Sequence, residues 1–170
     1  MLFLADLSSF YILIIVIILL CIIYITYIYA LFPFIRKKQI IKDIEKLALD
    51  NNQEITITKA NNSASYTISL NNTTYNIKIV FTSQDIDLQI NNIDTWYGYK
   101  GQNSKKIKTP IKFIKDASLN NKIIILARHA KTIKKVINES EMIMVKDETD
   151  IYNMHILNYN QYDYLIKKCN

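Results

Sequence analysis

The sequence is poor in the residues that commonly mark turns, disulfides and ligand-binding loops. Its 170 residues include two glycines, two prolines and two cysteines. Cys21 lies in an apolar run and Cys169 is next to the last residue, so no disulfide framework is indicated. The GxGxxG, P-loop and HExxH patterns are absent, which removes the usual signatures of dinucleotide, phosphate and zinc-protease sites. Lys and Arg are also absent before Arg36.

What the first part of the chain does contain is a long apolar run. Residues 10–35 carry no charge and are rich in Ile, Leu, Val and Tyr. A helix rises about 1.5 Å per residue and the hydrocarbon layer is about 30 Å thick, so roughly 20 apolar residues can span it. The run therefore predicts a transmembrane helix over residues 10–35. Its one plainly polar side chain, Thr26, can bond back to the preceding turn, and Pro33 is expected to help end or bend the helix.

Two other interpretations of this run are weaker. A cleaved signal peptide needs a cationic start, a short apolar core and a small-residue cleavage site. Residues 1–9 contain Asp6 and no Lys or Arg, the run is too long, and FPFIRKK is not a small-residue site. A buried helix of a soluble core is rarely this long. Three tyrosines at one end of the run suit the level of the lipid headgroups: Tyr24, Tyr27 and Tyr29.

The cations predict the orientation of the chain. Flanks rich in Lys and Arg normally stay in the cytoplasm. We therefore expect residues 1–9 outside the cell, the span in the cell membrane, and everything after Arg36 in the cytoplasm. Five cations would lie near the inner leaflet, where anionic lipid can contribute about 1 kcal/mol each: Arg36, Lys37, Lys38, Lys42 and Lys46. An ordinary stop-transfer flank followed by a core-packing helix explains the same cluster.

The remaining chain predicts one small domain with a basic balance. Asp6 is the only charged residue before Arg36, so the rest carries 21 Lys and Arg against 14 Asp and Glu. Residues 36–52 have apolar side chains at helical spacing and predict an amphipathic juxtamembrane helix. Residues 53–170 are then the cytoplasmic domain. The bias towards Ile, Asn, Lys and Tyr is typical of an AT-rich genome and indicates a low-GC bacterium or one of its mobile elements.

The first half of this domain predicts strands. EITITKA, SYTISLNN, TYNIKIVF and DIDLQINN alternate apolar and polar residues, which is typical of half-buried antiparallel strands. DTWYGYKGQNSKK holds both glycines and the only tryptophan, and it predicts a loop. Thr109-Pro110 then indicates the start of a helix, PIKFIKDASL, which would bury Ile111, Ile114 and also Phe113.

The second half predicts a strand, a helix and a strand. KIIILA is a continuous apolar run that favours a strand buried on both faces. KTIKKVINES is interpreted as a helix and EMIMVK as a second strand, which together form a right-handed βαβ unit. MHIL adds an edge strand and NYNQYDYLIKK ends as a short helix. The predicted fold class is α/β or α+β: one transmembrane helix, then a single mixed sheet with an antiparallel meander and a C-terminal βαβ unit.

This order of elements, α-β-β-β-α-β-α-β over residues 40–145, resembles the restriction-endonuclease-like fold. The resemblance implies an acidic residue paired with an Asp/Glu-x-Lys tripeptide on adjoining strands, which together hold Mg²⁺. In this sequence no acidic residue is followed by lysine two positions later. The nearest match is Asn76-Ile77-Lys78, in which an amide replaces the charged oxygen ligand. The resemblance therefore implies a nuclease-like domain with altered or lost catalysis.

Other candidate chemistry is sparse. Asp85 and Asp87 would share one strand face, with Asp94 following, and could hold a cation. A solvated strand face is the simpler interpretation and we prefer it. His129 and His155 lack the spaced partners of a zinc site or a nucleophile. We predict no catalytic residue, no metal site and no cofactor.

One pattern points to binding. Eleven cations between Lys100 and Lys135 are opposed only by Asp116. If two helices in this stretch lie side by side, their outer faces form a basic patch for nucleic-acid phosphates, anionic lipid or an acidic protein. Trp96, Tyr97 and Tyr99 could then stack on bases. A lysine-rich solvated surface with Trp96 in the core is the alternative, since Arg is scarce. The patch residues are Lys105, Lys106, Lys108, Lys112, Lys115, Lys131, Lys134 and Lys135.

The leading functional hypothesis is a non-enzymatic, single-pass membrane protein with a cytoplasmic interaction or scaffold domain. Its expected partners are the lipid bilayer, anionic lipid and a protein. The alternative is the membrane-tethered nuclease-like domain, which would bind nucleic acid through the basic patch. A toxin, immunity or phage-encoded membrane factor is a third possibility, for which the sequence has no positive mark.

Overall fold

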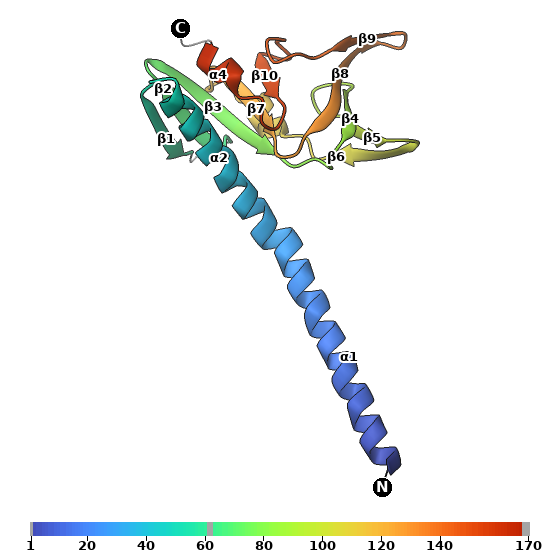
Figure 1. The fold of residues 1–170 in the computed structure, drawn as a ribbon. Coiled ribbons are helices and arrows are strands. Elements are labelled where there is room, and N and C mark those ends of the chain that lie inside the picture. Colours follow the sequence, from blue (N-terminus) through green and yellow to red (C-terminus); the bar gives the residue numbers. More distant parts are fainter. Residues whose placement is uncertain (1, 61–62, 168–170) are drawn as a thin grey trace. The chain divides into compact units, whose positions relative to one another are not determined.

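The computed structural model describes residues 2–60 and 63–167, with side chains from residue 10 onward (Figure 1). The chain divides into two compact units, Met1–Lys38 and Gln39–Asn170. Met1 and the side chains of the predicted external segment lie outside the described residues, as does Cys169. Elements are mixed α and β, as the sequence predicts, but the strands form two sheets rather than one.

The first unit is helical. Helix α1 (Leu2–Thr26) leads into a π-helical segment, η1 (Tyr27–Leu31), and then into helix α2 (Phe32–Asp50). Every described side chain from Phe10 to Leu31 is exposed. This region contains one helix that is long and apolar enough to cross a membrane, near the N-terminus, and none of its apolar part is buried.

The predicted roles of Thr26 and Pro33 have different outcomes. Thr26 Oγ1 donates to the carbonyl of Ile22 at 2.8 Å, so the expected bond to the preceding turn is confirmed. Pro33 does not end the helix, because α2 runs through it. Proline lacks an N–H and its ring clashes with the carbonyl four residues earlier. The helix widens just before it instead, where the Phe32 N–H donates to the carbonyl of Tyr27.

The second unit begins with the amphipathic part of α2. Ile40, Ile44 and Ala48 are fully buried at a spacing of four residues, as predicted. They pack on a five-stranded sheet in the order β1-β2-β3-β7-β10. Its strands are β1 (Ile55–Lys59), β2 (Tyr66–Leu70), β3 (Thr73–Val80), β7 (Lys122–Leu126) and β10 (Met154–Leu157).

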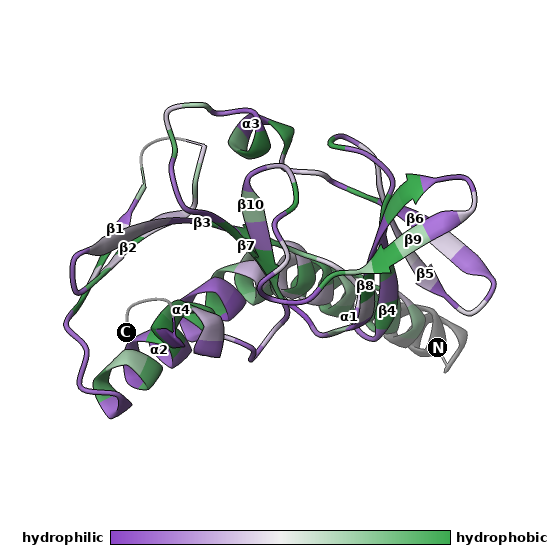
Figure 2. Cartoon of the chain, turned by 90° about the horizontal axis from the view of Figure 1, so that it is seen from above, coloured by the Kyte–Doolittle hydropathy of each residue, from purple (hydrophilic) through white to green (hydrophobic). Residues whose placement is uncertain are grey.

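This first sheet is mixed. Strands β1, β2 and β3 form the predicted antiparallel meander, β7 runs parallel to β3, and β10 runs parallel to β7. Strand β7 is buried on both faces, as its continuous apolar run predicts. Ile123 and Ile125 contribute to a core with α2 and the short helix α4 (Asp163–Lys167), whereas Ile124 and Leu126 contribute to a core on the opposite face. Figure 2 shows α2 and α4 on one side of this sheet.

The second sheet covers that opposite face. Its order is β6-β5-β4-β8-β9. The strands are β4 (Ile86–Ile90), β5 (Trp96–Lys100), β6 (Asn103–Ile107), β8 (Ala130–Asn138) and β9 (Glu141–Met144). Strand β8 is parallel to β4, and the other pairs are antiparallel. The shared core takes residues from both sheets and from helix α3 (Ile111–Ile114), with the fully buried Trp96 among them.

The predicted βαβ unit is wrong. The stretch KTIKKVINES, interpreted as a helix over residues 131–140, lies mostly in strand β8, and β9 returns antiparallel to it as a hairpin. Ile133, Val136 and Ile137 fit a helical spacing by chance, whereas in the strand Ile133 is buried and Ile137 is exposed. Parallel pairing does occur in this half of the chain, but between β3, β7 and β10 and between β4 and β8.

Two further predictions need correction. The glycine-containing stretch predicted as a loop is a hairpin of β5 and β6 that turns at Gly101, whose φ is +61°. The helix expected over residues 110–119 is a single turn, α3, that starts after Pro110. Phe113 is fully buried in it, but Ile111 is exposed. The predicted edge strand β10 and a short final helix, α4, are both present.

Candidate functional site

One face of the second sheet is not covered by the described part of the chain. We call it the open face. It carries alternate residues of all five strands, and none of their side chains is buried. The residues are Asp87, Gln89, Tyr97, Tyr99, Ser104, Lys106, Thr132, Lys134, Val136, Met142 and Met144. In the first sheet, α2 and α4 cover one side, and the second sheet covers the other side only over β7, β10 and the end of β3 at Val80.

Strand β5 explains how tyrosines reach this face. Successive side chains of a strand point to opposite sides, so Trp96 and Gly98 face the core while Tyr97 and Tyr99 face outward. The two tyrosine ring centroids lie 6.3 Å apart. Gly98 lies close against the core, and a Cβ there would meet Ile86 Cδ1 at 2.7 Å, so the Ile86 side chain would have to shift. The WYGY pattern therefore places a core anchor and two outward-facing rings on one strand.

The strand registers align charged and aromatic residues in a row. Lys106 lies opposite Tyr97, Tyr97 opposite Gln89, and Gln89 opposite Lys134. A second row runs through Ser104, Tyr99, Asp87 and Thr132. In that row the Thr132 hydroxyl donates to Asp87 Oδ1 at 2.6 Å. The open face thus presents Tyr97 in a row with two lysines, and Tyr99 in the next row beside a carboxylate that is already hydrogen-bonded.

The rest of the predicted basic patch is dispersed. Lys105 and Lys135 point to the other side of the second sheet, and Lys135 Nζ lies 4.6 Å from the centre of the Tyr152 ring. Four further lysines are exposed outside the open face: Lys108, Lys112, Lys115 and Lys131. The two adjacent helices on which we based the patch are not formed, because one of them is strand β8. Binding by these lysines stays a prediction.

The five cations expected at the membrane surface all lie on α2. Lys38, Lys42 and Lys46 are exposed, and they alternate in sequence with the buried Ile40 and Ile44. Arg36 and Lys37 are half-buried. Their contact with lipid stays a prediction, and the packing of α2 on the first sheet accounts for the amphipathic pattern by itself.

The residues nearest to a nuclease motif have structural partners. Lys78 Nζ donates to the carbonyl of Ser63 at 2.6 Å, and Asn76 Nδ2 donates to the carbonyl of Asn120 at 2.8 Å. Both contacts join strand β3 to loops. Close by, Ser63 Oγ donates to Asp116 Oδ2 at 2.7 Å.

Asp116 and Lys122 complete this polar group. Ser118 Oγ donates to Asp116 Oδ1 at 2.6 Å. The hydroxyl of Ser118, and then that of Ser63, lower the pKa of Asp116 from its usual 3.8 because they stabilise the carboxylate. Lys122 is buried, and its Nζ donates to the carbonyl of Ile114 at 2.8 Å. Sequence analysis missed this group, whose members come from loops and strand ends.

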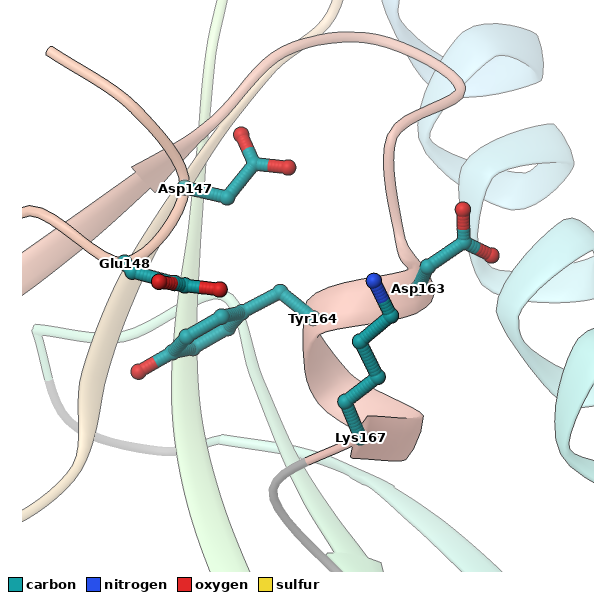
Figure 3. Close-up of a pocket in the computed structure, with 5 residues that line it drawn as sticks. All are labelled: Asp147, Glu148, Asp163, Tyr164 and Lys167. Carbon is teal, nitrogen blue, oxygen red and sulfur yellow. The ribbon is translucent and has the colours of Figure 1, made fainter.

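An acidic pocket lies beside α4 (Figure 3). It has a volume of about 400 Å³ and is lined by Asp147, Glu148, Asp163, Tyr164 and Lys167. Partial burial raises the pKa of Asp147, and the charges of Asp163 and Glu148 raise it further. Lys167 extends its ammonium between Tyr164 and Asp163 in Figure 3, which offsets part of the negative charge. The Tyr164 ring also contacts the His155 ring, with centroids 4.7 Å apart and planes tilted by 42°.

The remaining candidates for metal chemistry are separated. Asp85 precedes β4 and pairs with His129, at 3.6 Å from Oδ1 to Nδ1, whereas Asp87 bonds to Thr132. Among the described residues no group of three or more His, Cys, Asp or Glu side chains is placed to hold a metal ion. Comparison of the chain with protein-family models, with curated proteins and with solved structures found no match.

Proposed function

We propose that this chain is a single-pass membrane protein whose N-terminal helix anchors a cytoplasmic, non-enzymatic interaction domain. The observation that carries this proposal is the exposure of an apolar helix. Ile18 and Leu19, near its middle, are 52 % and 53 % exposed. Leaving such side chains in water forgoes about 1.5–3 kcal/mol each, so the helix needs a non-aqueous environment. A bilayer supplies it, and the length of the helix is sufficient.

The charge distribution supports a cytoplasmic domain. Arg36, Lys37 and Lys38 directly follow the apolar stretch, and no Lys or Arg precedes it. When only one flank of an apolar span is cationic, that flank is normally retained in the cytoplasm. Lys42 and Lys46, exposed on the same helix, extend the cationic flank along the chain.

The open face supports an interaction role for the domain. Small α/β domains commonly cover both sides of each sheet, as β7 of the first sheet is covered here. The second sheet instead leaves Tyr97 and Tyr99 accessible to solvent, and tyrosine is enriched at protein interfaces because its ring is apolar and its hydroxyl polar. A binding partner would cover this face.

Alkaline extraction tests the membrane anchor. Full-length protein, expressed in bacteria, should stay in the membrane pellet at high pH, whereas a matched chain that starts at Gln39 should move to the supernatant. Recovery of the full-length chain in the supernatant would refute the anchor.

A second candidate function is binding of single-stranded nucleic acid by the open face. The specific observation is the row in which Tyr97 lies between Lys106 on one side and Gln89 and Lys134 on the other. Aromatic rings on a sheet can stack on bases, at about 1–3 kcal/mol for each base, while lysines neutralise phosphates.

Anisotropy of a labelled oligonucleotide separates the two functions. Lys106→Glu with Lys134→Glu should weaken binding by full-length protein and lower its salt dependence, by about 0.7 in the log–log slope for each phosphate that is no longer neutralised. Tyr97→Ala with Tyr99→Ala should weaken binding at every salt concentration. The control pair Lys112→Glu with Lys115→Glu, outside the open face, should have little effect. Absence of wild-type binding would exclude this candidate and leave the protein-interaction function standing.

Cleavage is a separate question under this second function. A nuclease-like domain should degrade the oligonucleotide in Mg²⁺ or Mn²⁺ and lose that activity with Asp87→Ala. Asp87 lies on the open face, where Thr132 holds its carboxylate. Intact oligonucleotide after incubation with either ion would exclude catalysis while leaving binding untouched.

A further inference from the structure

The edge strand β9 is the most apolar exposed strand of the domain. Met142 and Met144 are 52 % and 54 % exposed on the open face, and Ile143 is 36 % exposed on the other face. Figure 2 colours this strand as hydrophobic. An exposed edge that combines free backbone groups with apolar side chains is a template for pairing with another strand. The exposure of these apolar side chains on an edge strand therefore requires an explanation.

The other edge strands of the described sheets are blunted. Strand β6, at the opposite edge of the same sheet, carries Lys105 and Lys106, and lysine on an edge discourages pairing. Strand β1 exposes threonine and Lys59 rather than large apolar side chains. Strand β10 is largely buried. Strand β9 has none of these protections between Met142 and Met144.

The backbone of β9 is oriented for pairing. The N–H of Val145 donates to the carbonyl of Ile133 at 2.8 Å, so Val145 faces β8. Alternate residues of a strand direct their backbone groups to the same side, so Ile143 also faces β8, opposite Lys135. The N–H and C=O of Met142 and Met144 therefore point away from the sheet. These four groups match the hydrogen-bonding pattern of one more antiparallel strand.

The sequence of β9 is complementary to itself. In a two-fold arrangement centred on Ile143, Met142 of one copy lies opposite Met144 of the other, and Ile143 lies opposite Ile143. The outward backbone groups of Met142 and Met144 then bond to each other across the axis. Glu141 lies opposite Val145, so no like charges are opposed within the four residues of β9.

We propose that two copies of this chain associate by antiparallel pairing of their β9 strands. The pairing joins the two second sheets into one and makes their open faces continuous. Methionine side chains from both copies would pack together on that face, where their flexibility suits a self-complementary contact. Lipid insertion of the hairpin is a poorer explanation, because Glu139 and Glu141 carry charge at its tip. A strand from another protein would lack the two-fold register.

Disulfide cross-linking tests this register directly. A central non-hydrogen-bonded pair has Cα atoms about 4.5 Å apart, within the range that a disulfide spans. Ile143→Cys should therefore cross-link on mild oxidation of full-length protein in detergent, in a background with Cys21→Ser and Cys169→Ser. Lys105→Cys, at the centre of the β6 edge, is the matched control. We expect cross-linking to be about 10-fold or more faster at position 143 than at position 105.

A measurement of mass supplies an independent readout. Wild-type protein should be dimeric by light scattering, and Met142→Lys with Met144→Lys should be monomeric. Both lysines would project from exposed positions, and an unchanged melting temperature shows that the domain still folds. Equal cross-linking at positions 143 and 105, or a dimer that persists in the lysine variant, would overturn the proposal. Neither result depends on nucleic acid or on the orientation of the chain in a membrane.

Discussion

The same residue types have opposite environments in the two units of this protein. Isoleucine and leucine dominate the described part of α1 from Phe10 onward, where they are exposed, and they dominate the cores of the second unit, where they are buried. Ile18 is 52 % exposed, whereas Ile124 in β7 is fully buried. In the second unit, helices and sheets pack on one another and bury their apolar side chains. The described part of the first unit has no packing partner that buries its apolar side chains. This contrast is the basis of our proposal that lipid surrounds α1 while water surrounds the domain.

A smaller difference separates the two sheets of the domain. The first sheet is covered on both faces at β7, where every residue is buried, while the side of β2 and β3 away from α2 carries the unburied Thr67, Ser69 and Thr74. The second sheet is covered on one face, so each of its strands except β9 combines buried residues with half-buried or exposed ones. Substitutions in the first sheet should act on stability, while those on the open face should act on binding. The following predictions test both comparisons.

Neighbouring residues of β5 should give the largest contrast. Trp96→Ala removes a fully buried ring and should lower the free energy of unfolding by about 3–5 kcal/mol. Tyr97→Ala, one residue on but on the open face, should cost less than about 1 kcal/mol. Chemical denaturation of both variants measures the difference. Equal losses would mean that the open face is packed against part of the protein.

A charge in α1 should affect the membrane and not the domain. Leu19→Arg places a cation near the middle of the span and should cost about 2.5–3.5 kcal/mol of insertion. Its fraction in the membrane after alkaline extraction should fall, whereas Leu19→Ala should behave as wild type. The melting temperature of the domain should be unchanged in both. A lower melting temperature with Leu19→Arg would place this side chain in a protein core.

Gly98→Ala should have an intermediate effect on stability. The added Cβ would lie 2.7 Å from Ile86 Cδ1 and 3.2 Å from Ile107 Cδ1, so side chains in the shared core must shift. Overpacking of this kind typically costs about 1–3 kcal/mol. Pairing Gly98→Ala with Ile86→Val, which frees space beside the new methyl group, should recover part of the loss. No recovery would mean that the strain lies elsewhere.

Asp147 should produce the smallest effect, with a defined dependence on pH. Burial, Asp163 and Glu148 raise its pKa above the usual 3.8, so the folded state binds its proton more tightly than the unfolded state does. Stability is therefore lost as pH rises from about 3.8 through the raised pKa. Asp147→Asn should raise the melting temperature at pH 7, and the gain should vanish at lower pH.

Asp116 is the control, because its pKa is shifted in the opposite direction from that of Asp147. Its pKa is lowered by Ser118 and Ser63, so its stabilising contribution is present at neutral pH and is lost as pH falls through the folded value. Asp116→Asn should lower the melting temperature at pH 7. A shift in the same direction for both variants would contradict this account of the two carboxyl groups.

Much of the fold follows from the sequence where one signal dominates. The uncharged run at residues 10–35 gives a helix, the alternation around Ile68 and Ile77 gives strands, and the run at 122–126 gives a buried strand. Sequence analysis misses the hairpin of β5 and β6 because glycine and lysine are common in loops. Tyr97 and Tyr99 recur with a period of two, with Trp96 and Gly98 at the intervening positions. This alternation could predict both the strand and its outward-facing tyrosines.

Strand β8 shows the limit of local patterns. Its apolar residues at positions 133, 136 and 137 match a helix as well as a strand. Four β-branched residues, Thr132, Ile133, Val136 and Ile137, favour the strand, and pairing with β4 and β9 decides it. The candidate site depends on this same pairing, since Lys134 reaches the row of Tyr97 only through β4. Such long-range registers cannot be read from spacing along the chain.

Two-sided cysteine labelling tests the central claim, a membrane-anchored chain with its domain in the cytoplasm. A chain without Cys21 and Cys169 would carry one new cysteine at the exposed Lys105 of the domain. A membrane-impermeant maleimide should leave it unlabelled in intact cells and label it in inverted membrane vesicles. Labelling in intact cells would contradict the orientation, and recovery of the chain in the soluble fraction would contradict the anchor itself.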